Sequence, residues 1–475
     1  MSNLIFCDSF INGEFYKTNQ RFSVDDPATE KSIVEVSDID EQGVNNAITA
    51  AQGAFVKLKS TNATERSETL MRWYELVIKH KQTLAELMTK EQGKPLKESL
   101  GEIDYGAGFI KWFAEEAKRS YGDVIPPTDN NHRLTSFKQP VGVVAGITPW
   151  NFPVAMVTRK VAPAYAAGCS FILKPSEHTP LCAIALAYLA DQAGFVKGAF
   201  NVLVSQDAKT VGKMLTDSDV VRKFTFTGST GVGKQLLSQC AGTIKRTSME
   251  LGGNAPFIIF DNADIDDAIE GLMAAKFRNS GQACVAANRI FIQRGILDEV
   301  LNKITPKVAA LKVANGFEEG VDIGPLIYPK AKDKVQQLVQ DALDKGANLI
   351  GDNSDLGGSF QNPLIVTNVT TEMDIYHEEV FGPVLTVIPF DEESEVLALA
   401  NDVPYGLAAY FYSQNIKQIY RVSEGLEFGM VGVNEGVISN PVAPFGGVKQ
   451  SGLGREGGHQ GLNEYLEEKY VCIKI

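Results

Sequence analysis

Cys284 stands in a setting that suits a nucleophile. It follows Gly281 and Gln282 in a short run of small and polar residues, and such a turn lets a substrate approach the sulfur. A cysteine thiolate attacks carbonyl carbon and can carry a covalent intermediate. The alternative is a buried structural thiol, because free cysteines are among the most buried residue types. The residues around Cys284 favour the nucleophile without excluding that alternative.

Two other residues could supply acid–base and oxyanion chemistry. Glu250 ends a strand-like run and precedes two glycines, so we expect its carboxylate at the ligand-binding edge of a sheet. Burial there would raise its pKa toward that of a general base. Asn151 lies between Pro149 and Pro153, and a rigid turn suits an amide that donates to an oxyanion. The alternatives are a surface acid or an ion pair for Glu250 and an ordinary turn residue for Asn151.

Two segments have the residue types that hold a nucleotide. Lys174 and Glu177 follow a strand-like run, and their side chains could bind ribose hydroxyls, with solvent-exposed charges as the alternative. The glycine-rich segment 226–233 follows a strand and opens a helix, where backbone amides can meet a pyrophosphate. The chain lacks both the G-x-G-x-x-G and the P-loop patterns. Its five scattered histidines suggest no metal site.

These residues lie on a predicted series of alternating strands and helices. Strands separated by helices of this length predict a parallel sheet covered on both faces, with ligands at the carboxyl ends of its strands. Helices at 38–59 and 64–91 would form a cover layer, and a second α/β series spans 255–434 with long helices at 296–311 and 331–345. The first series comprises strands 141–147, 170–173, 200–204, 223–227 and 247–251 and helices 155–167, 181–193, 208–215 and 232–240.

Two segments look like edge strands, which a second subunit often pairs. They are 133–138, within the polar stretch 121–140, and the C-terminal 468–475.

Composition narrows the class of protein. The 475 residues include 45 Lys and Arg against 58 Asp and Glu, a net charge of −13, which argues against nucleic acid and anionic membranes as partners. Six cysteines without a CxxC pair favour a reducing compartment. The N-terminus has neither a secretory nor a transit pattern, and the most apolar stretch, 141–173, is broken by prolines and charges. We therefore expect a cytoplasmic protein.

Taken together, the motifs resemble those of the aldehyde dehydrogenase superfamily over nearly the whole chain. The resemblance implies the fold of that family: a Rossmann-like cofactor domain, an α/β catalytic domain and a β oligomerisation arm that forms homodimers or homotetramers. The segments that carry it are 149–153, 174–177, 226–233, 249–256, 281–284, 379–383 and 444–447.

The resemblance also implies domain bounds. They are 1–120 and 141–250 for the NAD(P)-binding domain, 251–434 for the catalytic domain, 121–140 and 456–475 for the arm, and 435–455 for a substrate-pocket loop that returns to the cofactor domain.

The resemblance implies a reaction, the oxidation of an aldehyde to an acid with NAD(P). Cys284 would attack the aldehyde, Asn151 and the Cys284 amide would stabilise the oxyanion, and Glu250 would activate water to hydrolyse the thioester. The implied cofactor-binding residues are Trp150, Lys174, Ser176, Glu177, Gly228, Ser229, Gly233, Glu379 and Phe381.

Two arginines narrow the substrate. Arg159 and Arg278 lie near the predicted active-site segments, and buried guanidinium groups need a carboxylate partner, with an internal ion pair as the alternative. The segments that contain these arginines and Ser439 resemble those of the succinate-semialdehyde dehydrogenase branch, in which the two arginines and the serine hold the distal carboxylate of the substrate. Phe152 and Phe445 complete the pocket that this resemblance implies. Glutarate semialdehyde is an alternative substrate, since one methylene is worth about 1–3 kcal/mol. Two further alternatives for the function are an aldehyde dehydrogenase with another substrate and a non-catalytic structural protein with the same fold.

Two departures from the branch have consequences. Ala286 stands where many members have a second cysteine, so a disulfide with Cys284 cannot form at that position. Glu177 stands where many NADP-preferring bacterial members have a small residue, and its carboxylate would bind ribose hydroxyls and repel a 2′-phosphate. We therefore predict that NAD is preferred and that NADP is tolerated.

Overall fold

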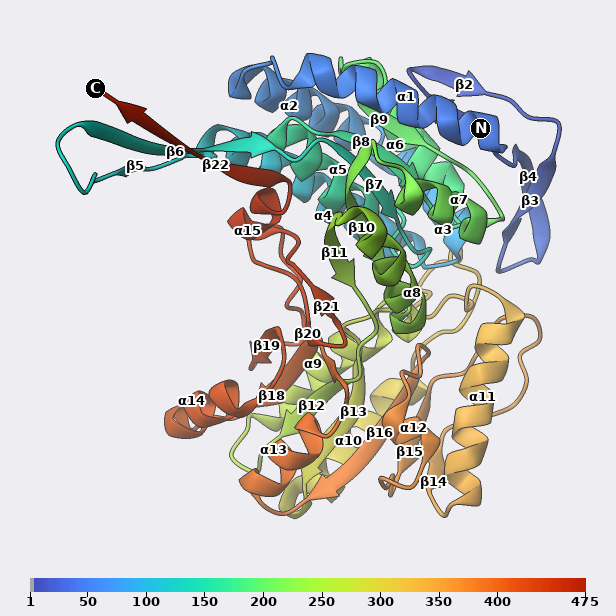
Figure 1. The fold of residues 1–475 in the computed structure, drawn as a ribbon. Coiled ribbons are helices and arrows are strands. Elements are labelled where there is room, and N and C mark those ends of the chain that lie inside the picture. The colour runs from blue at the N-terminus through green and yellow to red at the C-terminus, as the bar shows by residue number, and fades with distance from the viewer. Residues whose placement is uncertain (1–3) are drawn as a thin grey trace.

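The computed structural model describes residues 4–475, which form two lobes and a projecting arm (Figure 1). The first lobe contains a sheet with the strand order β2-β1-β9-β8-β7-β10-β11-β21, in which β7 to β11 run parallel. Its strands are β1 Ser9–Ile11, β2 Glu14–Tyr16, β7 Val143–Ile147, β8 Ser170–Lys174, β9 Phe200–Val202, β10 Val221–Thr227, β11 Arg246–Glu250 and β21 Gly452–Leu453.

Helices cover both faces of this sheet. One apolar core joins it to α2 through α6, and a second joins it to α1, α7 and α8. These helices are α1 Glu41–Leu58, α2 Ala63–Lys79, α3 Lys81–Gln92, α4 Leu96–Glu116, α5 Ala155–Ala167, α6 Pro180–Gln192, α7 Ala208–Asp217 and α8 Thr230–Cys240. The predicted strands and helices of 141–251 are confirmed with small shifts of their ends.

The predicted helix 64–91 is wrong as a single element. His80 has φ −100° and ψ 16°, outside the helical region, and it separates α2 from α3. No helix was predicted at α4, whose 21 residues include three glycines. Glycine weakens a helix signal, but here it allows close packing, because a Cβ on Gly106 would lie 2.8 Å from Cγ1 of Val154 beside α5.

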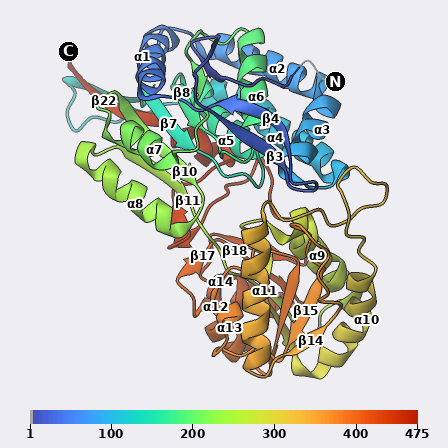
Figure 2. The same ribbon diagram turned by 90° about the vertical axis from the view of Figure 1, so that its right-hand side faces the viewer.

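The second lobe contains a mostly parallel sheet with the order β14-β15-β16-β13-β12-β18-β19. Its strands are β12 Ala255–Ile259, β13 Ala287–Gln293, β14 Asn348–Ile350, β15 Leu364–Thr367, β16 Val384–Phe390, β18 Ala408–Tyr412 and β19 Met430–Val433. Its helices are α9 Ile265–Phe277, α10 Leu297–Ala309, α11 Pro329–Asp344, α12 Asp374–His377, α13 Glu393–Asn401 and α14 Ile416–Gly425. The view in Figure 2 shows the two lobes one above the other, joined by extended segments.

The arm is a three-stranded antiparallel sheet that projects beyond both lobes (Figure 1). It consists of β5 Val124–Ile125, β6 His132–Pro140 and β22 Leu466–Lys474. The prediction that 133–138 is an edge strand is wrong, since β6 is paired on one side by β22 and on the other by β5. β22 is an outer strand, as predicted.

Short elements complete the fold. They are the pairs β3 Arg21–Asp26 with β4 Lys31–Ser37 and β17 Tyr405–Gly406 with β20 Val448–Lys449, the helix α15 Gly458–Asn463, and the 3-10 turns Ala117–Arg119, Ala241–Thr243, Arg278–Gly281 and Arg294–Ile296. Over residues 4–475, no helix is long and apolar enough to cross a membrane, and no three His, Cys, Asp or Glu side chains gather as a metal site would require.

Candidate active site

A strained turn presents Cys284 between the two lobes. Asn279, Ser280 and Gly281 have consecutive positive φ angles of 53°, 57° and 76°. Such angles are costly for residues with a Cβ, so the surroundings must hold them. The Glu98 carboxylate accepts from the Asn279 amide at 2.7 Å, and the Ser280 hydroxyl donates to Gly324 O at 3.0 Å. Gly281 is required here, because a Cβ would lie 2.3 Å from the Gly382 carbonyl oxygen.

The Cys284 side chain is partly buried, and burial raises the pKa of its thiol to about 12. The resting sulfur is therefore a thiol, which needs a base before it can attack. Arg159 acts in the opposite direction and lowers the pKa of Cys284.

Asn151 is held beside the same turn. Its Nδ2 donates to Gln282 O at 3.0 Å, within the segment that leads to Cys284. The backbone carbonyl oxygen of Asn151 accepts from Lys94 Nζ at 2.8 Å and from Asn279 Nδ2 at 2.9 Å. These contacts fix the turn at 149–153, so the amide of Asn151 faces the nucleophile segment.

A buried ion pair supports that turn from beneath. Lys94 Nζ lies 2.5 Å from Glu102 Oε2, and both side chains are 1% exposed. Glu102 Oε1 accepts from the backbone amides of Val154 at 2.9 Å and Ala155 at 3.2 Å. The pair therefore joins α4 to the start of α5, immediately after Asn151.

Glu250 is the last residue of β11, and its buried side chain lines the same cavity as Cys284. Both its carboxylate oxygens lack a hydrogen-bond partner among the described residues. Burial raises the pKa of Glu250 well above its ordinary value of 4.5, and the nearby Glu456 raises it further. A carboxyl of this kind is protonated at rest, and it must lose that proton to solvent before it can act as a base.

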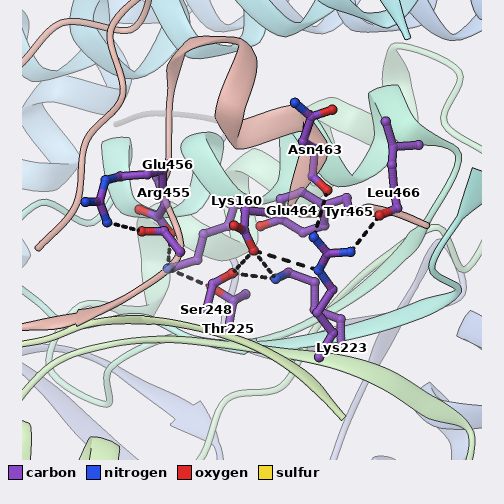
Figure 3. Close-up of polar contacts among 12 residues, drawn as sticks. Lys160, Lys223, Thr225, Ser248, Arg455, Glu456, Asn463, Glu464, Tyr465 and Leu466 are labelled. Carbon is purple, nitrogen blue, oxygen red and sulfur yellow. Dashed lines mark hydrogen bonds and ion pairs between the residues drawn. The ribbon is translucent and has the colours of Figure 1, made fainter. Parts of the chain in front are cut away.

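Glu456, and not Glu250, is the ionised carboxylate of this region. It forms ion pairs with Arg159 and Lys160, and these two cations lower the pKa of Glu456. Figure 3 shows Lys160 between Glu456 and Thr225, next to a second buried cluster of Lys223, Ser248 and Glu464. Glu456 was not singled out from the sequence, because its role depends on a contact with α5, almost 300 positions earlier.

Three adjoining cavities collect the predicted site residues. The outer cavity, of about 530 Å³, is lined by Trp150, Lys174, Ser176, Glu177, Gly228 and Ser229. The central cavity, of about 310 Å³, is lined by Trp150, Asn151, Gly228, Ser229, Glu250, Cys284, Glu379 and Phe381. The inner cavity is lined by Phe152, Arg159, Arg278, Cys284, Ser439 and Phe445. Cys284 lines both the central and the inner cavity, which places it where the two meet.

The outer and central cavities fit a dinucleotide. Ser229 is the N-cap of α8 and makes no side-chain cap hydrogen bond, so the first amides of that helix are free to bind an anion. Lys174 is 1% exposed and pairs with Glu177 at 3.0 Å, so Lys174 is not a solvent-exposed charge. Gly233 lines none of the three cavities; a Cβ there would lie 2.3 Å from Leu251 Cδ2, so this glycine packs α8 against β11.

The two arginines of the inner cavity differ. Arg159 pairs with Glu456 and stacks over the Phe445 ring at 4.5 Å, while its Nη2 has no hydrogen-bond partner in the described part of the chain. The Arg278 guanidinium lies over the Phe152 ring, 4.9 Å from the ring centroid. Among the described residues 4–475, no carboxylate lies within ion-pair distance of Arg278. The internal ion pair therefore applies to Arg159 and not to Arg278.

The cavities also contain residues that the sequence did not single out. Lys334 of α11 lines the central cavity and donates to the Glu379 carbonyl oxygen at 3.1 Å. Tyr105 of α4 and Met156 of α5 line the inner cavity, and Tyr328 lines the outer one. None belongs to a segment with a recognisable pattern, so spatial proximity is the only signal for them.

Comparison with known proteins decides the family. The aldehyde dehydrogenase family model matches residues 15–471. The chain belongs to the aldehyde dehydrogenase family. It is therefore an oxidoreductase of the family's NAD(P)-dependent type.

Relatives and solved structures agree over almost the whole length. The chain is 54% identical over 452 residues to the mitochondrial succinate-semialdehyde dehydrogenase of Oryza sativa subsp. japonica, covering 95% of this chain and 86% of that protein. It is 51% identical to the 3-sulfolactaldehyde dehydrogenase of Pseudomonas putida, covering 99% and 98%. The crystal structure of an E. coli NADP-dependent enzyme superposes with a TM-score of 0.99 at 49% identity, covering 100% and 99%.

Proposed function

We propose that this enzyme oxidises succinate semialdehyde to succinate. The carrying observation is Arg278, a cation without a carboxylate partner among the described residues, in the same cavity as Cys284. A guanidinium group in a water-poor pocket favours a carboxylate ligand strongly. Ser439 and the free Nη2 of Arg159 line the same cavity and would complete the recognition of the distal carboxylate.

The geometry supports a two-stage reaction on Cys284. Once Glu250 has released its own proton to solvent, its carboxylate takes the proton of the Cys284 thiol, and the sulfur attacks the aldehyde carbon to give a thiohemiacetal alkoxide. Asn151 Nδ2 and the Cys284 amide would stabilise this oxygen, each donor being worth about 3 kcal/mol. When bound, NAD(P) would accept the hydride, and Cys284 would then carry the acyl group as a thioester. Glu250 must release its proton to solvent before this stage; its carboxylate then takes a proton from a water molecule, the resulting hydroxide attacks the thioester carbon, and the C–S bond breaks to release succinate and the Cys284 thiolate.

Other groups would hold the cofactor. Lys174, Ser176 and Glu177 would contact the adenosine ribose, and the amides near Ser229 the pyrophosphate. Glu379, with Phe381 and Trp150, would position the nicotinamide half over Cys284. We propose that NAD is preferred, because the carboxylate of Glu177 would accept from ribose hydroxyls and repel a 2′-phosphate.

The arm supports an oligomer, a homodimer or homotetramer. Val124 is 85% exposed, Ile473 is 52% exposed and Ile475 is 64% exposed, so the arm presents apolar side chains that a second copy could cover. We also propose the domain division given above: 1–120 with 141–250, then 251–434, 435–455 and the arm at 121–140 with 456–475. The sheet of β5, β6 and β22 supports the arm, whereas Leu462 of α15 packs in the core of the first lobe. Six free cysteines, three of them buried (Cys169, Cys182 and Cys240), fit a reducing, cytoplasmic environment.

A substrate panel tests the proposed activity. Wild-type enzyme should reduce NAD fastest with succinate semialdehyde, measured at about 340 nm, more slowly with glutarate semialdehyde, and slowest with butanal. 3-Sulfolactaldehyde belongs in the panel because one relative of this chain is named as a 3-sulfolactaldehyde dehydrogenase. Higher kcat/KM for butanal or 3-sulfolactaldehyde would contradict the proposal.

Two variants assign the roles. Cys284→Ala should abolish NADH formation, and an unchanged rate would exclude Cys284 as the nucleophile. Arg278→Ala should raise KM for succinate semialdehyde far more than for butanal. Equal losses with both aldehydes would make Arg278 a structural residue.

A further inference from the structure

We infer that Tyr105 determines specificity for the carboxylate end of the substrate, as a hydroxyl donor beside Arg278 and Ser439. This inference rests on the proposed function and adds a group to the substrate site. It makes Tyr105 responsible for the choice between anionic and neutral aldehydes, and leaves the chemistry at Cys284 unchanged.

The position of Tyr105 is fixed by helix packing. It lies on α4, one residue before Gly106, where the absence of a side chain lets α4 approach the start of α5. Its ring packs edge-on against Phe109 at 4.9 Å between centroids. The side chain therefore lines the inner cavity, together with Ser439, Cys284 and both arginines.

The surroundings of the Tyr105 hydroxyl are those of an anion site. Ser439, Arg159 and Arg278 line the same cavity as Tyr105, and both arginines act to lower the pKa of Tyr105. Burial outweighs these cations and raises the pKa of Tyr105 above its ordinary value of 10.0, so the phenol keeps its proton at neutral pH and can donate it.

The charges around the cavity make such a donor useful. Glu456 already compensates Arg159, so Arg278 is left to neutralise a bound carboxylate. A carboxylate has about four acceptor positions, more than the one exposed edge of a guanidinium group can satisfy. Tyr105 and Ser439 would fill the remaining positions, and a neutral aldehyde would gain nothing from them.

The ring of Tyr105 has a separate role that the test must leave intact. Arg278 lies over this ring at 5.8 Å, as well as over Phe152 at 4.9 Å. Tyr105→Phe keeps the ring and removes only the hydroxyl. Tyr420→Phe is a matched control, because Tyr420 is 65% exposed on α14, in the other lobe.

Steady-state kinetics with two aldehydes gives the decisive measurement. We expect Tyr105→Phe to lower kcat/KM for succinate semialdehyde about 10-fold, mainly through KM, as for loss of one hydrogen bond to a charged group. The value for butanal should stay within about twofold, and succinate should become a correspondingly weaker product inhibitor. Tyr420→Phe should change neither.

The outcomes separate this inference from the proposed function. If the wild type prefers succinate semialdehyde and Tyr105→Phe keeps both that preference and the succinate inhibition constant, the role of Tyr105 is refuted alone. Equal losses with both aldehydes would also refute it, since the hydroxyl would then serve packing or chemistry. If the wild type shows no preference for the anionic aldehyde, the proposed function fails and this inference fails with it.

Discussion

Lys94→Met should damage stability and catalysis together, because one ammonium group supports both the fold and the oxyanion site. Lys94 donates to Glu102 at 2.5 Å and to the carbonyl of Asn151 at 2.8 Å, and burial lowers the pKa of Lys94. Methionine fills the same volume with no charge. The variant therefore leaves a buried carboxylate without its cation and frees one contact of the Asn151 turn.

The contacts set the expected size of each effect. Removing one partner of a buried ion pair costs about 3–5 kcal/mol. Glu102 keeps two backbone donors at Val154 and Ala155, so we expect the lower end, about 3 kcal/mol. For a lobe of this size that lowers the thermal midpoint by about 6–12 °C. Asn279 still holds the Asn151 carbonyl at 2.9 Å, so kcat should fall by about 10- to 100-fold and not by the full loss of Asn151→Ala.

Thermal unfolding and steady-state kinetics measure the two effects separately. The loss of kcat should be the same for succinate semialdehyde and butanal, since every aldehyde forms the same oxyanion. Lys97→Met is a matched control, because Lys97 is exposed in the first turn of α4, three residues after Lys94. A double-mutant cycle with Glu102→Gln should give a coupling of about 1–3 kcal/mol.

Three results would refute this reasoning. An unchanged kcat with a lowered midpoint would show that Asn151 is positioned without Lys94. A loss confined to succinate semialdehyde would place Lys94 in substrate recognition. An unchanged midpoint would mean that the buried pair contributes nothing to stability.

Two further predictions concern ionisation and cofactor choice. Cys284 and Glu250 must both lose protons to act and burial raises the pKa of each, so kcat/KM should still be rising with pH at about pH 9, and a maximum near pH 6 would contradict this. The folded-state pKa of Glu250 exceeds the unfolded value of 4.5, so above pH 4.5 the native state keeps a proton that the unfolded state has lost. The contribution of Glu250 to the free energy of unfolding therefore falls as the pH rises above 4.5. Glu250→Gln should remove this pH-dependent contribution in thermal unfolding while abolishing turnover. Glu177→Ser should raise the NADP-to-NAD ratio of kcat/KM about 10-fold by removing a like charge, and an unchanged ratio would exclude Glu177 as the selector.

Short local patterns in the amino-acid sequence sufficed to identify the family and the α/β class, and to propose the residues of the reaction. Cys284, Glu250 and Asn151 lie in short segments of distinctive composition, each next to a strand whose pattern is local. The strands and helices of 141–251 were predictable for the same reason. The helical periodicity of 64–91 did not reveal the break at His80, whose backbone lies outside the helical region. It also did not indicate α4, because three glycines weaken the helical pattern of that segment.

The contacts that support these residues and set their charges became visible only in the three-dimensional fold. Glu456, Tyr105 and Lys94 come from three separate segments and have no motif of their own. Their roles follow from burial, since a charge or hydroxyl removed from water must find a partner, and which partner it meets depends on long-range packing. The same packing decided that Arg159 has an internal carboxylate while Arg278 remains free, although the sequence presents the two arginines as equivalent.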